Sequence, residues 1–177
     1  MTALLLVIIY MTFIGLGLPD TLLGVSWPLM HIEFGVNEGI AGAMSLAISA
    51  VTVISSLFSG RITQRIGTAK ITAFSVLMTG IGILQIAFMP SIYSFFLFAI
   101  PLGLGAGAVD TSLNNYVSSH FKPRHMSWLH ALWGVGAMTG PVIMSFFLKR
   151  GQWRPGYLTV AIILLAMSFV LFLTLPV

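Results

Sequence analysis

The stretch Arg61-Ile-Thr-Gln-Arg65-Ile-Gly67 recurs 89 residues later as Arg150-Gly-Gln-Trp-Arg154-Pro-Gly156, and both copies follow the pattern Arg-x3-Arg-x-Gly. An Asp-Thr pair recurs at almost the same offset, as Asp20-Thr21 and Asp110-Thr111, each time inside an apolar segment. The two recurrences predict that the chain is a duplicated unit. A duplication that places one acid in a membrane segment of each copy indicates secondary transport, in which sites form between structural repeats.

The composition is that of an integral membrane protein. Hydrophobic residues make up 58% of the chain and charged residues 7%, whereas about a quarter of the residues of soluble domains are charged. Six apolar segments approach or exceed the roughly 20 residues that cross the hydrocarbon core. They span residues 3–30, 39–59, 70–89, 92–118, 126–148 and 156–175, and the first ends near Trp27-Pro28. All are expected to be helices, because lipid offers no partners to backbone N–H and C=O groups.

The expected fold is all-α: a single bundle of six transmembrane helices over residues 1–177, built as two inverted three-helix repeats. Repeat one covers about 3–89 and repeat two about 92–175. Because three spans is an odd number, the second copy inserts upside down relative to the first. The last span has no glycine after Gly156 and is rich in Ile, Leu, Val and Phe, which predicts a lipid-facing helix at the edge of the bundle.

The basic residues indicate topology rather than nucleic-acid binding. The net charge is +4, but the eight Lys and Arg side chains lie in short loops between spans. The majority falls on one side, so the positive-inside rule predicts a multi-pass protein of the cell's inner membrane with a cytoplasmic amino terminus. The lipid bilayer is the expected surrounding partner. The chain has no cysteine, which excludes a disulfide framework and a thiolate site, and neither a metal site nor a cofactor is predicted.

Asp20 and Asp110 are the only formal charges in the interior of the predicted spans, because Lys70 lies at the very start of its span. An ionised carboxylate at mid-bilayer is costly, so such a residue faces a cavity or a partner, or stays protonated. No Lys or Arg lies in the interior of the predicted spans to pair with either acid. We hypothesise that at least one of them is a proton-coupling site, and both are candidate solute-binding residues. The alternative is a protonated Asp that hydrogen-bonds a neighbouring helix and only holds the bundle together.

Gly103, Gly107, Asp110 and Asn114 follow one another at intervals of 4, 3 and 4 residues, which places them on one helical stripe. Small residues make room, and amide groups hydrogen-bond hydroxylated solutes. The stripe is therefore interpreted as a cavity wall with Asn114 as a binding residue. The alternative is that the glycines are packing contacts and that Asn114 or Asn115 caps the cytoplasmic end of the span.

His130 and Trp133 lie three residues apart, and hence on one face of the fifth span. Both are candidate solute-binding residues, and Trp133 could stack against a sugar ring. His130 could instead pair with an aspartate across the bundle or lie at the membrane interface. In the same span, Gly136-Ala-Met-Thr-Gly140-Pro141 combines a small-xxx-small packing motif with a proline. This combination predicts a kink and a close helix contact, which a moving gate or a static bundle could use.

The six spans, the duplication and the stretch Gly60-Arg-Ile-Thr-Gln-Arg65-Ile-Gly67-Thr-Ala-Lys70 resemble the amino-terminal half of a major facilitator superfamily transporter. The stretch is similar to the superfamily signature Gly-x3-Asp/Glu-Arg-x-Gly-x-Arg/Lys-Arg/Lys. Gln64 replaces the acid that normally joins a charge latch between the two halves, and Ala69 replaces a base. Gly136-x3-Gly140-Pro141 is similar to the superfamily's fifth-span motif. The resemblance implies gating roles for Gly60, Arg65, Gly67, Lys70, Gly136, Gly140 and Pro141.

Within the superfamily, Leu18-Pro19-Asp20-Thr21 and the segment from Gly103 to Asn114 look most like the fucose permease group of sugar/proton symporters. That group has an acid in each position, one implicated in proton coupling and one in sugar recognition. The resemblance implies H⁺-coupled uptake of a sugar or another small polar solute by alternating access. It also implies a site shared with a second six-helix half, either another copy or a missing carboxy-terminal half.

Two alternatives from other functional classes stay open. Two membrane aspartates could activate water in an intramembrane aspartyl protease, although Leu18-Pro19-Asp20 and Ala108-Val109-Asp110 lack the Tyr-Asp and Gly-x-Gly-Asp motifs of those enzymes. The chain could also be a membrane assembly protein that does not transport and whose acids only mediate helix association. Transport is the preferred prediction, and no enzymatic activity is expected.

Overall fold

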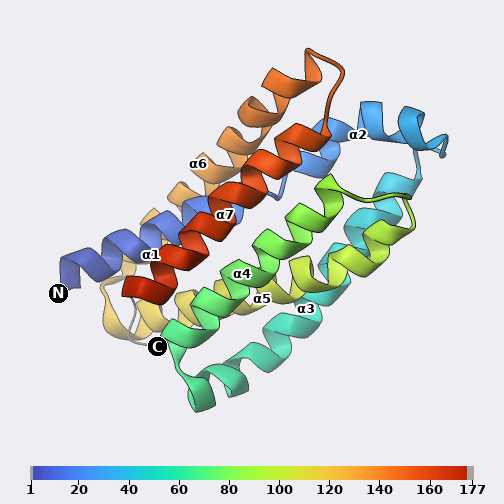
Figure 1. Cartoon of the computed structure of the whole chain (residues 1–177). Coiled ribbons are helices and arrows are strands. Elements are labelled where there is room, and N and C mark those ends of the chain that lie inside the picture. The colour runs from blue at the N-terminus through green and yellow to red at the C-terminus, as the bar shows by residue number, and fades with distance from the viewer. Residues whose placement is uncertain (1, 175–177) are drawn as a thin grey trace.

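The computed structural model describes residues 2–174, with side chains from residue 5 onward. Within that part, the helices are α1 (Thr2–Gly17), α2 (Leu22–Phe34), α3 (Ile40–Ile66), α4 (Thr68–Ala87), α5 (Ser94–His120), α6 (Pro123–Leu148) and α7 (Arg154–Thr174). Six helical stretches are long and apolar enough to cross a membrane, because α1 and α2 together form the first. The predicted all-α chain with six spans is confirmed (Figure 1). Residue 175, the end of the expected second repeat, lies outside the described residues.

The first span is broken in the middle, so the expectation of one continuous helix over 3–30 is wrong. α1 ends at Gly17 and α2 begins at Leu22. Pro19 has no N–H to donate, and it disfavours the helical conformation in the residue before it. The break places Asp20 in a short turn between two helices.

α2 also continues past the predicted end of the first span. It passes through Pro28 and stops at Phe34, where Gly35 adopts a left-handed conformation with φ +62°. The Gly35 N–H donates to the carbonyl of Ile32 over 3.2 Å, a common way to end a helix. Glu33, which lies beyond the predicted end of the first span, is therefore a helical residue.

α3 is longer than the predicted span 39–59. It includes Arg61 and Arg65, because a helix keeps its own backbone groups paired beyond the hydrocarbon edge. Gly67 ends it at φ +89° and donates its N–H to the carbonyl of Thr63 over 2.9 Å. A side chain at Gly67 would be strained in this conformation, which explains the glycine of the repeated motif at this turn.

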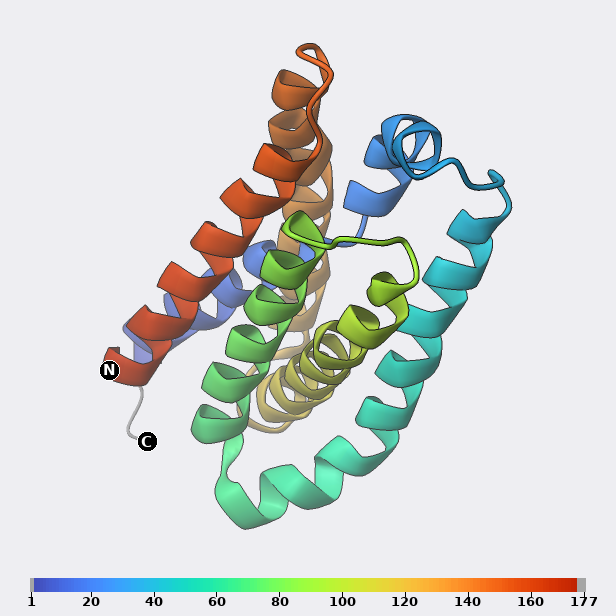
Figure 2. The same ribbon diagram turned by 45° about the vertical axis from the view of Figure 1, so that its right-hand side comes forward.

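α4 and α5 occupy the middle of the bundle, with α3 against α5 and α7 against α4 (Figure 2). On the other side, α6 packs against α1 and α2. Under the expected division into repeats, the second span of each repeat therefore packs on the first span of the other. An inverted repeat would produce such an exchange of contacts. The superposition of the two helix triplets stays a prediction.

Two glycines of α5 allow close approach by its neighbours. A Cβ on Gly103 would lie 2.9 Å from the carbonyl oxygen of Ile48 in α3, and one on Gly105 would overlap the carbonyl of Ser75 in α4. Lipid provides no hydrophobic drive for helix association, so backbone contacts of this kind supply much of the packing energy.

α7 is not the purely lipid-facing helix that its composition predicts. One face, which includes Tyr157 and Leu164, is buried, while Ile162 on the opposite face is 57% exposed. The glycine that permits this contact lies on the neighbouring helix, because a Cβ on Gly80 of α4 would come within 3.0 Å of Leu165. The lack of glycine in α7 after Gly156 therefore does not indicate whether the helix packs against others.

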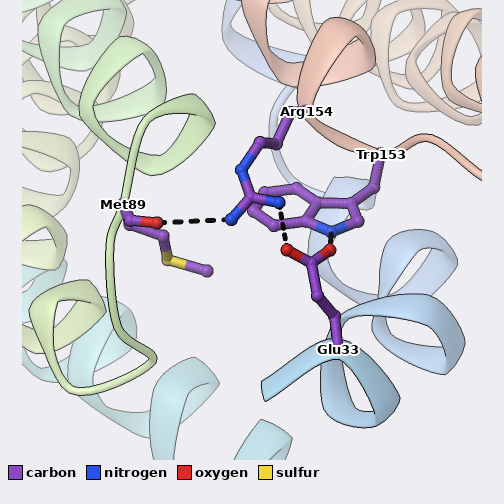
Figure 3. A network of polar contacts seen from close by, with 4 residues as sticks. All are labelled: Glu33, Met89, Trp153 and Arg154. Carbon is purple, nitrogen blue, oxygen red and sulfur yellow. Dashed lines mark hydrogen bonds and ion pairs between the residues drawn. The ribbon is translucent and has the colours of Figure 1, made fainter.

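A polar network joins three parts of the chain at the end of the bundle that carries the α2–α3 and α6–α7 connections (Figure 3). The indole N–H of Trp153 donates to Glu33 Oε2 over 2.6 Å, and Arg154 forms an ion pair with the same carboxylate. Arg154 also donates to the carbonyl of Met89 over 3.4 Å. The second arginine of the repeated motif thus ties α2 to α7 and to the segment after α4.

Glu33→Leu is expected to lower the free energy of unfolding by about 1–3 kcal/mol, because the buried indole of Trp153 loses its acceptor. Glu33→Gln is expected to cost less than about 1 kcal/mol. The amide oxygen still accepts the indole bond, and the lost ion pair joins side chains that are 40% and 42% exposed. Thermal unfolding of the purified protein compares the two variants; equal losses would contradict this account of Trp153.

Candidate functional site

A groove of about 910 Å³ lies between the break in the first span and helices α3, α5 and α6. Its polar lining comes from Asp20, Thr21, Ser45, Ser49, Thr52, Asp110 and Trp133, and its apolar lining includes Leu16, Leu23, Ile48, Val53 and Leu102. The structure thus brings both predicted acids and Trp133 into one cavity. No Lys or Arg lines it among the described residues.

Asp20 is held at the groove by the break between α1 and α2. Its Oδ2 accepts a hydrogen bond from the indole N–H of Trp133 in α6 over 2.8 Å. The adjacent Thr21 hydroxyl donates to the carbonyl of Ala137 over 3.0 Å. The sequence predicted Trp133 as a stacking residue and missed its bond to Asp20. A signal was present, because an indole N–H needs an acceptor and Asp20 lacks a basic partner.

Gly136 and Gly140 of α6 form the surface against which the broken first span packs. A Cβ on Gly136 would overlap the carbonyl oxygen of Ile14, and one on Gly140 would overlap that of Leu18. In return, a Cβ on Gly17 would overlap the carbonyl of Trp133. The predicted close contact of the small-xxx-small motif is therefore present. α6 continues as one helix through Pro141, and the kink stays a prediction.

Asp110 lines the groove from α5. Asn114, one turn further along, donates its Nδ2–H to Asp110 Oδ1 over 2.9 Å. The Oδ1 atom of Asn114 is buried and has no donor among the described residues. His130 lies within electrostatic range of Asp110, and its ring meets that of Phe13 edge-on with 6.4 Å between centroids. Asn114 and His130 thus neighbour an acid without lining the groove.

The interpretation of the whole Gly103–Asn114 stripe as a cavity wall is wrong for its glycines. Gly103 and Gly107 are buried, and a Cβ on Gly107 would overlap the carbonyl of Thr52 in α3. They are packing contacts, as the alternative reading had it. Only Asp110 of the four residues reaches the groove, because the helix turns the glycines toward α3.

Three hydroxyl residues of α3 line the groove and were not predicted. Ser45, Ser49 and Thr52 lie at intervals of 4 and 3 residues, so they share one face of the helix. None of the three hydroxyls makes a hydrogen bond in the described part of the chain. Their spacing was visible in the sequence, but Ser and Thr are common in membrane helices as packing residues.

Comparison with known proteins identifies the family. The family model described as Major Facilitator Superfamily matches residues 4–177. The chain belongs to this superfamily. Superfamily members are non-enzymatic transporters, so the intramembrane protease alternative is excluded.

This superfamily member is similar to several curated transporters. It is 26% identical to a niacin transporter of Acinetobacter baylyi over 142 residues, which is 78% of this chain and 31% of that protein. It is 23% identical to the class B tetracycline resistance protein of Escherichia coli over 177 residues, 97% of this chain and 43% of that protein. It is 26% identical to a cis,cis-muconate transport protein of Acinetobacter baylyi over 140 residues, 75% of this chain and 33% of that protein. The chain spans less than half the length of these relatives.

The superfamily signature at the α3–α4 turn is exposed. Arg65 and Lys70 are exposed and form no ion pair within residues 2–174. A Cβ on Gly60 would meet nothing within 4 Å. The described residues therefore show no internal latch around this signature, and the gating role stays a prediction.

Proposed function

We propose that the chain is one half of a secondary transporter that takes up a sugar or another small polar solute together with protons, by alternating access. The observation that carries the proposal is the groove that Asp20 and Asp110 share with Trp133. An acid at membrane depth that faces a cavity marks a solute or ion pathway. The superfamily match and the named activities of the relatives support transport of a small solute.

Proton coupling is assigned to Asp20 and Asp110. Each carboxylate accepts one hydrogen bond from a neutral side-chain donor, Trp133 or Asn114, and neither is paired with Lys or Arg among the described residues. A proton taken up at mid-membrane removes the charge that is costly there. The resemblance of both acid positions to the fucose permease group supports the coupling and the choice of a sugar. In this scheme Asn114 and His130 act through Asp110.

The second half is proposed to cover the groove on the side of α3 and α6. These are the least buried spans, with 11% and 17% of their membrane windows inside the chain. They expose large apolar side chains, such as Leu46 and Leu57 in α3 and Met138 and Val142 in α6. The partial coverage of the relatives supports a missing half, and a second copy of the chain is the alternative. We also propose an inner-membrane location with a cytoplasmic amino terminus, from the distribution of basic residues.

Isolated monomers are expected not to transport, because half of the solute site and one wall of the pathway are absent. Uptake of labelled hexoses into proteoliposomes under an inward proton gradient tests this, with the chain reconstituted alone and together with its second half. Robust uptake by chain shown to be strictly monomeric would contradict the half-transporter, and no uptake by the assembled protein for any small solute would contradict transport.

A further inference from the structure

The charged side chains that line the groove are all acidic. Asp20 and Asp110 each bring a carboxylate, and no Lys or Arg of the described residues lines the groove. The eight basic residues of the chain lie at helix ends or in the connections between helices. A second copy facing the first would add two more acids and no base. Coulomb attraction in such a groove favours a cationic group and disfavours a carboxylate.

The groove has no free side-chain N–H donor among the described residues. Its one side-chain N–H donor, the indole of Trp133, is committed to Asp20 at 2.8 Å. The carboxylates of Asp20 and Asp110 can only accept hydrogen bonds when they are ionised. The lining therefore offers a surplus of acceptors, which a solute rich in N–H and O–H groups satisfies.

The ring of Trp133 favours a cation over other solutes that carry N–H and O–H groups. The bond to Asp20 fixes the plane of the indole, and the side chain is still 39% exposed where it lines the groove. The face of an indole attracts an ammonium group within about 6 Å. A cation at this place would meet the aromatic face and the Asp20 carboxylate together.

Building on the proposed transport, we infer that the solute carries a protonated amine as well as hydroxyl groups, as an amino sugar does, and that carboxylate solutes are rejected. One aspartate pairs with the ammonium group, and the other is left to exchange the proton. The unbonded hydroxyls of Ser45, Ser49 and Thr52 on the facing helix meet the solute's hydroxyl groups. The chain would then differ in solute charge from the relative named for muconate, a dicarboxylate.

Glucosamine, glucose and glucuronate provide the probes, because they share a ring and are respectively a cation, a neutral molecule and an anion at neutral pH. Binding to the assembled protein in lipid nanodiscs is measured at pH 7 by thermal shift and by calorimetry. Glucosamine is expected to bind about tenfold tighter than glucose, and glucuronate is expected to show no binding at the same concentrations. Equal affinity for the three, or a preference for glucuronate, would overturn the inference.

The acids are tested with Asp20→Asn combined with Asp110→Asn, which should bring the glucosamine-to-glucose ratio to about one. Glu38→Gln replaces one acid by its amide at a side chain that is 82% exposed and outside the groove, and it should leave the ratio unchanged. If the double variant does not fold, the order of the affinities for the three sugars, measured with the unsubstituted protein, still tests the inference.

The test separates this inference from the proposed transport. Uptake of the three hexoses by the assembled protein with equal affinity would overturn the amine preference and support transport. The expected binding order without uptake of any of them would contradict transport and support the amine preference.

Discussion

Asp110→Asn is expected to abolish uphill accumulation of the solute. A transporter that moves one proton with each solute molecule accumulates solute about tenfold for each unit of pH gradient, since one unit is equivalent to about 1.4 kcal/mol. The asparagine cannot exchange a proton, so the accumulation ratio under a gradient of about one unit should fall to about one. The variant keeps an oxygen that can accept the Asn114 bond, so the fold should be retained. Uptake into proteoliposomes of the assembled protein measures the ratio.

A solute-exchange assay distinguishes the loss of proton coupling from the loss of folded protein. Exchange of labelled for unlabelled solute at equal pH needs no net proton movement, so Asp110→Asn should retain it. Asp20→Asn is compared in the same way, because its amide oxygen can still accept the Trp133 bond. Glu38→Gln serves as the control outside the groove. Unchanged pH dependence of uptake in both aspartate variants would exclude these acids as the coupling site.

Gly136→Leu is expected to prevent α6 from packing against the first span. A side chain at this position would overlap the carbonyl oxygen of Ile14, which belongs to a helix backbone and cannot rotate away. Overpacking of a tight contact typically costs about 1–3 kcal/mol and can be larger where backbone must move. The expected result is loss of most folded protein, or a marked fall in melting temperature, and displacement of Trp133 from Asp20.

Gly134→Leu on the same helix is the matched control, because a Cβ on Gly134 meets nothing within 4 Å. Yield after gel filtration in detergent and the midpoint of thermal unfolding compare the two variants. Equal stability of both leucine variants would show that the Gly136 contact does not hold the first span in place.

The number and type of spans follow from the sequence, because a membrane helix is set by local hydrophobic length and by backbone pairing. The helix ends were less predictable. α3 continues through Arg61 and Arg65, since hydropathy reports the edge of the hydrocarbon and not the end of the helix. The break at Pro19 had a local signal, but proline is tolerated in many membrane helices, as Pro28, Pro101 and Pro141 are here.

The sequence predicted the site residues whose type is unusual in a membrane span, and it missed those whose type is common there. Two acids in apolar segments are unusual, and both line the groove. The hydroxyls of α3 were missed because serine and threonine also occur as packing residues. The pairing of Glu33 with Trp153 and Arg154 joins residues about 120 positions apart, so only the tertiary arrangement reveals it. Likewise, the sequence does not show which helix a glycine packs against, and so it could not show whether Gly103 and Gly107 line a cavity or a helix contact.

Asp20 and Asp110 line one groove, and the proposed function requires that water reaches it at membrane depth. The chain has no cysteine, so Ser49→Cys introduces one thiol in the groove and Ile162→Cys one thiol on the outer face of α7. Their reaction rates with membrane-impermeant methanethiosulfonate reagents, one cationic and one anionic, are measured in native membranes. We predict rapid modification at Ser49→Cys, faster with the cationic reagent, and a smaller charge preference when Asp110→Asn is added. A rate at Ser49→Cys no higher than at Ile162→Cys, or one indifferent to reagent charge, would contradict the account.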